Sequence, residues 1–103
     1  MNPTDTWVLI SYRARPGCGD LAARELSALV ATVREREPDC TGITVVRHDE
    51  DPDAFTLVET WTSREAYAGP HLQTPHLLAF KARAGEFMAG PPAITYWGLV
   101  TQV

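Results

Sequence analysis

Two strand-like segments and the turn between them decide the fold: Ile43-Thr-Val-Val-Arg-His-Asp-Glu-Asp-Pro-Asp-Ala-Phe-Thr-Leu-Val-Glu-Thr-Trp61. Both ends of this stretch are rich in β-branched and aromatic residues, which favour strands, and the acidic middle contains the Asp and Pro residues typical of turns. We therefore predict a β-hairpin with strands over 43–47 and 55–61.

The segment before the hairpin is predicted to contain one strand and one helix. Trp7 to Arg13 is rich in β-branched and aromatic residues and is followed by the turn residues Pro16-Gly17. From the N-cap residue Asp20, apolar residues recur at helical spacing, which predicts a helix of about 17 residues that ends by Pro38.

The segment after the hairpin is predicted to contain two helices and one strand. Ser63 is a candidate N-cap for a short helix over 64–68, which Gly69-Pro70 ends. Thr74-Pro75 is expected to begin a second helix that continues to Gly90. Alternation over Ala93 to Val100 predicts the last strand.

The resulting order, β-α-β-β-α-α-β, predicts an α+β fold of the ferredoxin-like, split βαβ type in one domain over 1–103. In such a fold, an antiparallel sheet carries its helices on one face. Strand residues on both faces are substantially apolar: Val8 and Ile10 alternate with Trp7 and Leu9. Because an uncovered apolar face usually marks an interface, we expect a homodimer in which two sheets pack face to face.

Composition narrows the possible partners. The chain has 103 residues, 45% hydrophobic and 21% charged, which is the balance of a globular protein. Its net charge of −4 repels phosphate backbones and anionic lipids, so neither nucleic acid nor a membrane is an expected partner. The sequence shows no membrane span or secretory signal, and we expect a soluble cytoplasmic protein.

Cys18 and Cys40 flank the predicted long helix, whose length separates them too far for a disulfide, so both are expected to be reduced thiols.

One set of residues is more specific than the general pattern: Glu59-x-Trp61, then Tyr67, His71-Leu-Gln-Thr-Pro-His76, and Gly90-Pro91-Pro92. This set resembles the antibiotic biosynthesis monooxygenase domain, and the resemblance covers nearly the whole chain. It implies a dimeric α+β barrel and oxygenases of anthrone-like and quinol substrates that use no flavin, haem or metal. The family also includes an isomerase of a phosphorylated signalling sugar and haem-degrading enzymes, so the fold alone does not decide the reaction.

The haem-degrading branch can be tested on the residues themselves. Its members place a Trp, an iron-ligating His and an Asn at set positions. Aligned from Trp61, these positions fall on Pro70, Phe80 and Ile10, respectively. Haem degradation is therefore not expected, and we expect no cofactor and no metal.

An oxygenase without a cofactor depends on an electron-rich phenolate or enolate substrate, for which the protein supplies a dry aromatic pocket, a base and hydrogen-bond donors. We expect Trp61 and Tyr67 to line that pocket and Tyr12 or Tyr96 to contribute a hydroxyl. Phe80 and Phe87 are assigned to the core, where aromatic residues at strand and helix spacing are usually found.

His71 and His76 are the candidate catalytic bases, because imidazole transfers protons near neutral pH. Alternatively, His71 caps the short helix and His76 bonds backbone groups in the next one. Pro75 and the five-residue spacing make the two histidines a poor metal pair.

Three further charged residues each have two possible roles. Glu59 could accept a proton or orient a histidine, but an ion pair with Arg13, Arg47 or Arg83 is favoured. Lys81 and Arg83 would stabilise an anionic substrate if they pointed into the cleft, although solvated positions are favoured.

We therefore predict a cofactor-independent monooxygenase that oxidises an electron-rich polycyclic aromatic or quinol metabolite with dioxygen. Two alternatives stay open. The dimer could bind a small hydrophobic molecule without turnover, or the same pocket could catalyse an isomerisation, for which one histidine would suffice.

Overall fold

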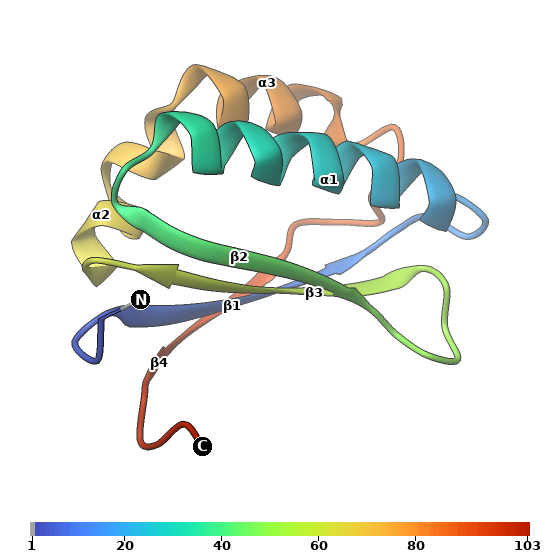
Figure 1. The fold of residues 1–103 in the computed structure, drawn as a ribbon. Coiled ribbons are helices and arrows are strands. Elements are labelled where there is room, and N and C mark those ends of the chain that lie inside the picture. The colour runs from blue at the N-terminus through green and yellow to red at the C-terminus, as the bar shows by residue number, and fades with distance from the viewer. Residues whose placement is uncertain (1) are drawn as a thin grey trace.

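The computed structural model describes residues 2–103 and contains one four-stranded antiparallel sheet with the strand order β2-β3-β1-β4. The α+β arrangement predicted from the sequence is confirmed: helices α1 and α3 lie over one face of the sheet (Figure 1). The elements are β1 (Thr6–Arg13), α1 (Gly19–Arg36), β2 (Cys40–Arg47), β3 (Ala54–Trp61), α2 (Arg64–Ala68), η1 (Pro70–Gln73, a 3-10 helix), α3 (Pro75–Ala84) and β4 (Ala93–Gly98).

The predicted hairpin is present as β2 and β3, which pair from Arg47↔Phe55 to Cys40↔Trp61. Strand β2 begins at Cys40, three residues before the expected start, and an irregularity lies between Cys40 and Gly42. The loop between the strands is ordered by His48, whose Nδ1 accepts hydrogen bonds from the backbone N–H groups of Glu50 and Asp51.

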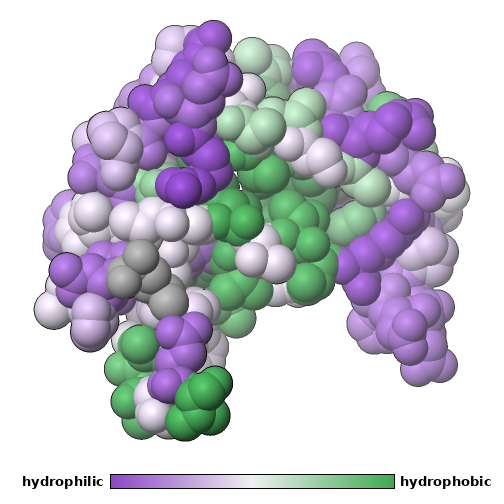
Figure 2. All heavy atoms as spheres, viewed as in Figure 1, coloured by the Kyte–Doolittle hydropathy of each residue, from purple (hydrophilic) through white to green (hydrophobic). Residues whose placement is uncertain are grey.

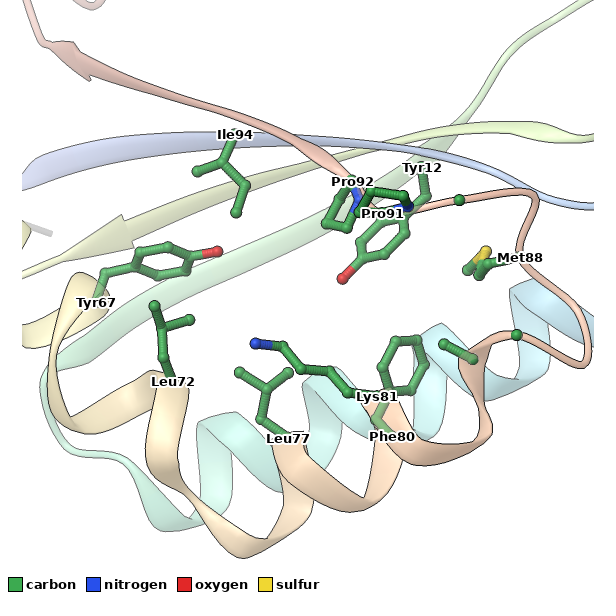
Figure 3. A pocket seen from close by; sticks show the side chains of 13 residues that line it. Tyr12, Tyr67, Leu72, Leu77, Phe80, Lys81, Met88, Pro91, Pro92 and Ile94 are labelled. Atoms are coloured by element: carbon green, nitrogen blue, oxygen red, sulfur yellow. The ribbon is translucent and has the colours of Figure 1, made fainter.

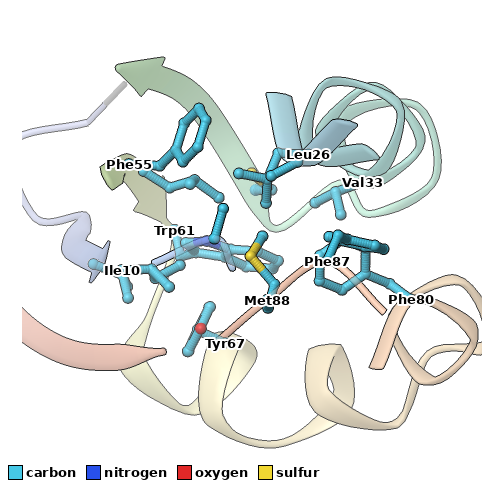
Figure 4. Close-up of a cluster of buried hydrophobic side chains, with 14 residues drawn as sticks. Ile10, Leu26, Val33, Phe55, Trp61, Tyr67, Phe80, Phe87 and Met88 are labelled. Carbon is cyan, nitrogen blue, oxygen red and sulfur yellow. The ribbon is translucent and has the colours of Figure 1, made fainter. Parts of the chain in front are cut away.

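The core lies between the sheet and the helices (Figure 4). Strand β1 is central in the sheet, and its Val8 and Ile10 face the helices, whereas Trp7 and Leu9 face the opposite side. Side chains from three elements meet there: Leu26 and Val33 from α1, Phe55, Leu57 and Trp61 from β3, and Phe80 from α3. Burying one such large side chain stabilises the fold by about 1.5–3 kcal/mol.

Helix α1 connects β1 to β2, and the carboxylate of Glu37 follows its last turn. The turn before it uses Gly17 at a φ of 81°, a conformation that glycine adopts without steric cost. The helix ends where Glu37 takes an extended conformation before Pro38, as the residue before a proline prefers. Both cysteines are free thiols, which confirms the expectation from the sequence.

The short helices after β3 form partly as predicted. Ser63 caps α2, because its Oγ accepts a hydrogen bond from the N–H of Ala66 at 3.0 Å. Thr74 precedes α3 without capping it through its side chain; its hydroxyl instead donates to the carbonyl of His71 at 2.9 Å. That carbonyl belongs to η1, which occupies the segment expected to be an irregular break.

The predicted end of α3 is wrong. The helix ends at Ala84, not near Gly90, and Arg15 Nε donates a hydrogen bond to the carbonyl of the following Gly85 at 2.7 Å. The apolar Phe87 and Met88 continue the helical spacing in sequence, but Met88 pairs with Ala14 as an isolated β-bridge. Tertiary contacts with the end of β1 therefore override the local pattern.

Candidate functional site

A cavity of about 580 Å³ lies between α3 and the sheet (Figure 3). This volume is within the range of small-molecule binding sites. The lining is mostly apolar, and its residues come from six parts of the fold: Tyr12 of β1, Tyr67 of α2, Leu72 of η1, Leu77, Phe80, Lys81 and Ala84 of α3, Gly85, Met88, Gly90, Pro91 and Pro92 of the segment that leads into β4, and Ile94 of β4.

The spacing of residues on α3 builds one wall of the cavity. Leu77, Lys81 and Ala84 are four and three residues apart and therefore share a face of the helix. Pro91 and Pro92 close the opposite side, where the chain runs from Met88 into β4 (Figure 3). The wall is rigid because proline fixes the backbone φ angle there.

Two tyrosine hydroxyls point into the cavity, one from Tyr12 and one from Tyr67 (Figure 3). Burial raises the pKa of Tyr12 to about 12, with a further increase from the charge of Glu59. The same two causes, burial first, raise the pKa of Tyr67. Both hydroxyls are therefore protonated near neutral pH, and neither has a hydrogen-bond partner within residues 2–103. Each is available as a donor to a molecule in the cavity.

Lys81 also directs its amine into the cavity (Figure 3). Lys81 is exposed, as favoured from the sequence, and it also lines the cavity. Within the described chain, no carboxylate lies within 4.0 Å of the amine. Arg83, in contrast, forms an ion pair with Glu25 of α1.

Glu59 is buried, and no cation among residues 2–103 forms an ion pair with it, so the predicted ion pair is wrong. The three expected partners bind other carboxylates: Arg13 binds Asp51, Arg47 binds Asp20 and Arg83 binds Glu25. Instead, the indole N–H of Trp61 donates to Glu59 Oε1 at 2.8 Å. Burial raises the pKa of Glu59 to about 7; the Trp61 hydrogen bond opposes the increase, and the charge of Glu37 adds to it.

A single carboxylate, Glu37, joins the two predicted catalytic histidines. His71 Nδ1 lies 2.9 Å from both carboxylate oxygens, and His76 Nε2 lies 2.6 Å from Oε2. A carboxylate only accepts hydrogen bonds, so His71 donates through Nδ1–H and His76 donates through Nε2–H. All three side chains are at most 11% exposed, and the cluster fastens the end of α1 to η1 and α3.

His71 also packs in an aromatic cluster next to the cavity. Its ring centroid lies 4.6 Å from that of Trp61 and 4.9 Å from that of Tyr67. Burial lowers the pKa of His71, whereas the hydrogen bond and charge of Glu37 raise it. The net direction is downward, so the imidazole is neutral near pH 7.

The structure brings only some of the predicted site residues together at the cavity. Tyr12 and Tyr67 line it. Tyr96 lies behind Tyr67 with an edge-to-face ring contact at 6.0 Å and is outside the lining. Trp61, 1% exposed, belongs to the core and does not line the cavity, and neither His71 nor His76 reaches it.

Sequence reasoning missed Glu37 altogether and left open whether Lys81 points into the cavity. The spacing of Lys81 from Leu77 is a signal that was available, since four residues along a helix return to the same face. No comparable signal existed for Glu37, which lies 34 and 39 residues from its two partners.

Two classes of structural feature are absent from the described residues. No helix among residues 2–103 combines the length and apolar character needed to cross a bilayer. Nor does this part of the chain group three or more His, Cys, Asp or Glu side chains in a way that would hold a metal ion.

Solved structures with the same fold span nearly the whole chain. PA3566 from Pseudomonas aeruginosa is 26% identical, with a TM-score of 0.84, and the match covers 95% of this chain and 96% of that one. Rv0793 from Mycobacterium tuberculosis is 23% identical, with a TM-score of 0.79 and coverage of 95% and 97%. A crystal structure described as an antibiotic biosynthesis monooxygenase is 21% identical, with a TM-score of 0.80 and coverage of 93% and 99%.

No curated protein sequence matches the chain significantly. The model of one protein family, described as antibiotic biosynthesis monooxygenase, does match, over residues 7–83. The matched range runs from β1 to the last turn of α3 and includes most of the residues that carried the resemblance, from Glu59 to His76, whereas Gly90-Pro91-Pro92 lies beyond it. The chain therefore belongs to the antibiotic biosynthesis monooxygenase family.

Proposed function

We propose that this protein is a cofactor-independent monooxygenase that oxidises an electron-rich polycyclic aromatic or quinol metabolite. The observation that carries the proposal is the apolar cavity into which two protonated tyrosine hydroxyls, those of Tyr12 and Tyr67, point. Such a cavity excludes water from a reactive intermediate and offers donors to an oxyanion or peroxide as charge develops on it. Membership of the monooxygenase family supports the same reaction class.

The substrate supplies the electrons in this reaction. Loss of a proton gives a phenolate or enolate, which passes one electron to dioxygen. The radical pair then combines, so that a C–O bond forms, and the base returns its proton to the resulting peroxide anion to give a hydroperoxide. Loss of water from the hydroperoxide breaks the O–O bond and leaves a carbonyl at the oxidised carbon. One oxygen atom stays in the product, and the other leaves as water with two hydrogens of the substrate.

Glu59 is the base that we propose for the first step. Its pKa of about 7 suits proton transfer near neutrality, and its charge acts on both tyrosines of the cavity. Glu59 is outside the lining, and no hydrogen bond joins it to either cavity hydroxyl within residues 2–103, so we propose that a water molecule carries the substrate proton to it. His71 and His76 are proposed as positioning residues: they hold Glu37, and the ring of His71 packs against that of Tyr67.

The expected result of an assay is oxygen consumption by the metal-free protein with an anthrone or hydroquinone. Tyr67→Phe is expected to lower the rate by about a hundredfold, because it removes a donor to the developing oxyanion. Tyr96→Phe is the matched control, since Tyr96 packs against Tyr67 outside the cavity lining. An oxygen electrode and product mass spectrometry provide the measurements.

The same assay separates the alternatives. Product formation without oxygen would replace oxygenation with isomerisation, and saturable binding without product would indicate a ligand-binding protein. No oxygen uptake across a panel of such substrates, or equal rates for both tyrosine variants, would contradict the proposal.

We also propose that two copies associate through the open face of the sheet. This face carries the partly exposed apolar residues Trp7, Leu9, Val46, Val58 and Trp97, with Trp97 56% exposed. Figure 2, viewed along the edge of the sheet as in Figure 1, shows apolar surface in the centre of this edge, below the polar surface of the helices. Such a patch favours self-association through a symmetric interface.

Light scattering is expected to give twice the 11.4 kDa mass of the chain. Trp97→Arg places a charge on the open face and is expected to shift the protein to the monomer, because burying an unpaired charge is costly. Leu78→Arg is the control, since Leu78 is 47% exposed on α3, away from this face. A wild-type monomer at high concentration would exclude the dimer.

A further inference from the structure

We propose that Lys81 and the hydroxyls of Tyr12 and Tyr67 form an anion-recognition site, so that the ligand of the cavity is a flat aromatic molecule carrying a single negative charge on oxygen. The proposal rests on the cavity of the proposed function but not on oxygenation. It adds a substrate class: an aromatic acid or a phenolate rather than a neutral aromatic compound.

The position of Lys81 is the first line of support. It is the only lysine in the chain, and it lies on the wall of α3 between the apolar Leu77 and Ala84. Figure 3 shows its amine extending into the space toward which both hydroxyls also point. An ammonium and two hydroxyls are all donors, so together they suit an anionic oxygen acceptor.

The unpaired state of Lys81 is the second line of support. Arg83, which is also in the last turn of α3, forms an ion pair with Glu25, and Arg13 and Arg47 bind carboxylates as well. Lys81 has no carboxylate within 4.0 Å in the part of the chain that the structure describes. A cation facing an apolar cavity without a protein partner is available to a ligand.

The composition of the lining limits the ligand to one charge. Apart from Lys81 and the two tyrosines, the lining consists of aliphatic, proline, glycine and phenylalanine residues together with Met88. One cation neutralises one anionic group, whereas a second charge would be desolvated without compensation, which is costly. The cavity therefore favours a monoanion with an apolar body over a phosphate ester or a dicarboxylate.

Binding of naphthoate and naphthamide tests the proposal, because the two compounds have similar shapes and differ in charge. By calorimetry on the full chain, naphthoate is expected to bind at least about tenfold more tightly. Lys81→Met should remove most of this preference by weakening naphthoate binding more than naphthamide binding, whereas Lys81→Arg should keep part of it. Arg83→Met is the matched control on the same helical turn and should behave as the wild type.

The single lysine allows a direct readout on the wild-type chain. Reductive methylation with carbon-13 formaldehyde labels only Lys81 and the terminal amine and keeps the positive charge. The Lys81 signal is identified by its absence from the NMR spectrum of the labelled Lys81→Arg variant. Naphthoate is expected to shift this signal, and naphthamide is expected to shift it less. Equal affinity for the two compounds, failure of both to bind, or a Lys81 signal that does not respond to naphthoate would overturn the proposal.

A naphthol tests whether the negative charge of the ligand belongs to a phenolate or to a carboxylate. Absorbance of the bound compound near neutral pH reports whether the cavity ionises it to naphtholate. Ionisation by the wild type but not by Lys81→Met supports a phenolate formed in the site, whereas preference for naphthoate alone supports a carboxylate. Binding of either anion without oxygen uptake would keep this proposal and remove oxygenation.

Discussion

Replacing Glu37 with alanine is expected to lower the free energy of unfolding by about 3–5 kcal/mol. The substitution leaves the Nδ1–H of His71 and the Nε2–H of His76 buried without their common acceptor. It also removes the contact by which the end of α1 holds η1 and α3. Urea unfolding near neutral pH measures the change, and Glu35→Ala, at an exposed position on α1, is the control.

The same variant tests the proposed positioning role. Glu37 raises the pKa of His71 against the effect of burial, so its removal is expected to lower that pKa further. Histidine signals followed by NMR across the acidic range report the shift. An unchanged His71 titration together with unchanged stability would show that the cluster neither holds the fold nor controls the imidazole.

Between pH 4.5 and about 7, the ionisation of Glu59 is expected to lower the free energy of unfolding of the wild type by about 3 kcal/mol. Replacing Glu59 with glutamine is expected to remove this pH-dependent loss. The pKa of Glu59 is raised from 4.5 to about 7, so the folded state binds more protons than the unfolded state between these values. The contribution of protonated Glu59 to the free energy of unfolding is fully present below pH 4.5 and is lost as pH rises through about 7. Glutamine does not titrate, so the variant should gain stability relative to the wild type over this window.

Denaturant unfolding at several pH values measures this difference. Glu86→Gln is the control, because Glu86 is exposed. If Glu59 is the base, its glutamine variant should also lose oxygen uptake while still binding aromatic ligands. Parallel stability profiles for Glu59→Gln and the wild type would show that the carboxyl ionises as it does in water.

Local patterns were sufficient for most of the fold. Alternating residues on β1 and β3, the cap at Ser63 and the break at Pro38 act over a few residues, and each appears in the structure as predicted. The end of α3 was not predictable in this way. Phe87 and Met88 continue the helical spacing, yet the helix ends before Gly85. There the Gly85 carbonyl accepts a hydrogen bond from Arg15, and Met88 pairs with Ala14, and both partners are far away in sequence.

The sequence by itself determined the element order and the α+β class, because periodicity, capping residues and turn residues are local properties, and its spaced motif residues carried the resemblance to the family. Only the tertiary structure decided how the candidate site is built. It paired His71 and His76 with Glu37, placed Trp61 beside Glu59 in the core and turned Lys81 toward Tyr12 and Tyr67. These relations depend on the packing of α1, α3 and the sheet, which brings together residues that no local pattern links.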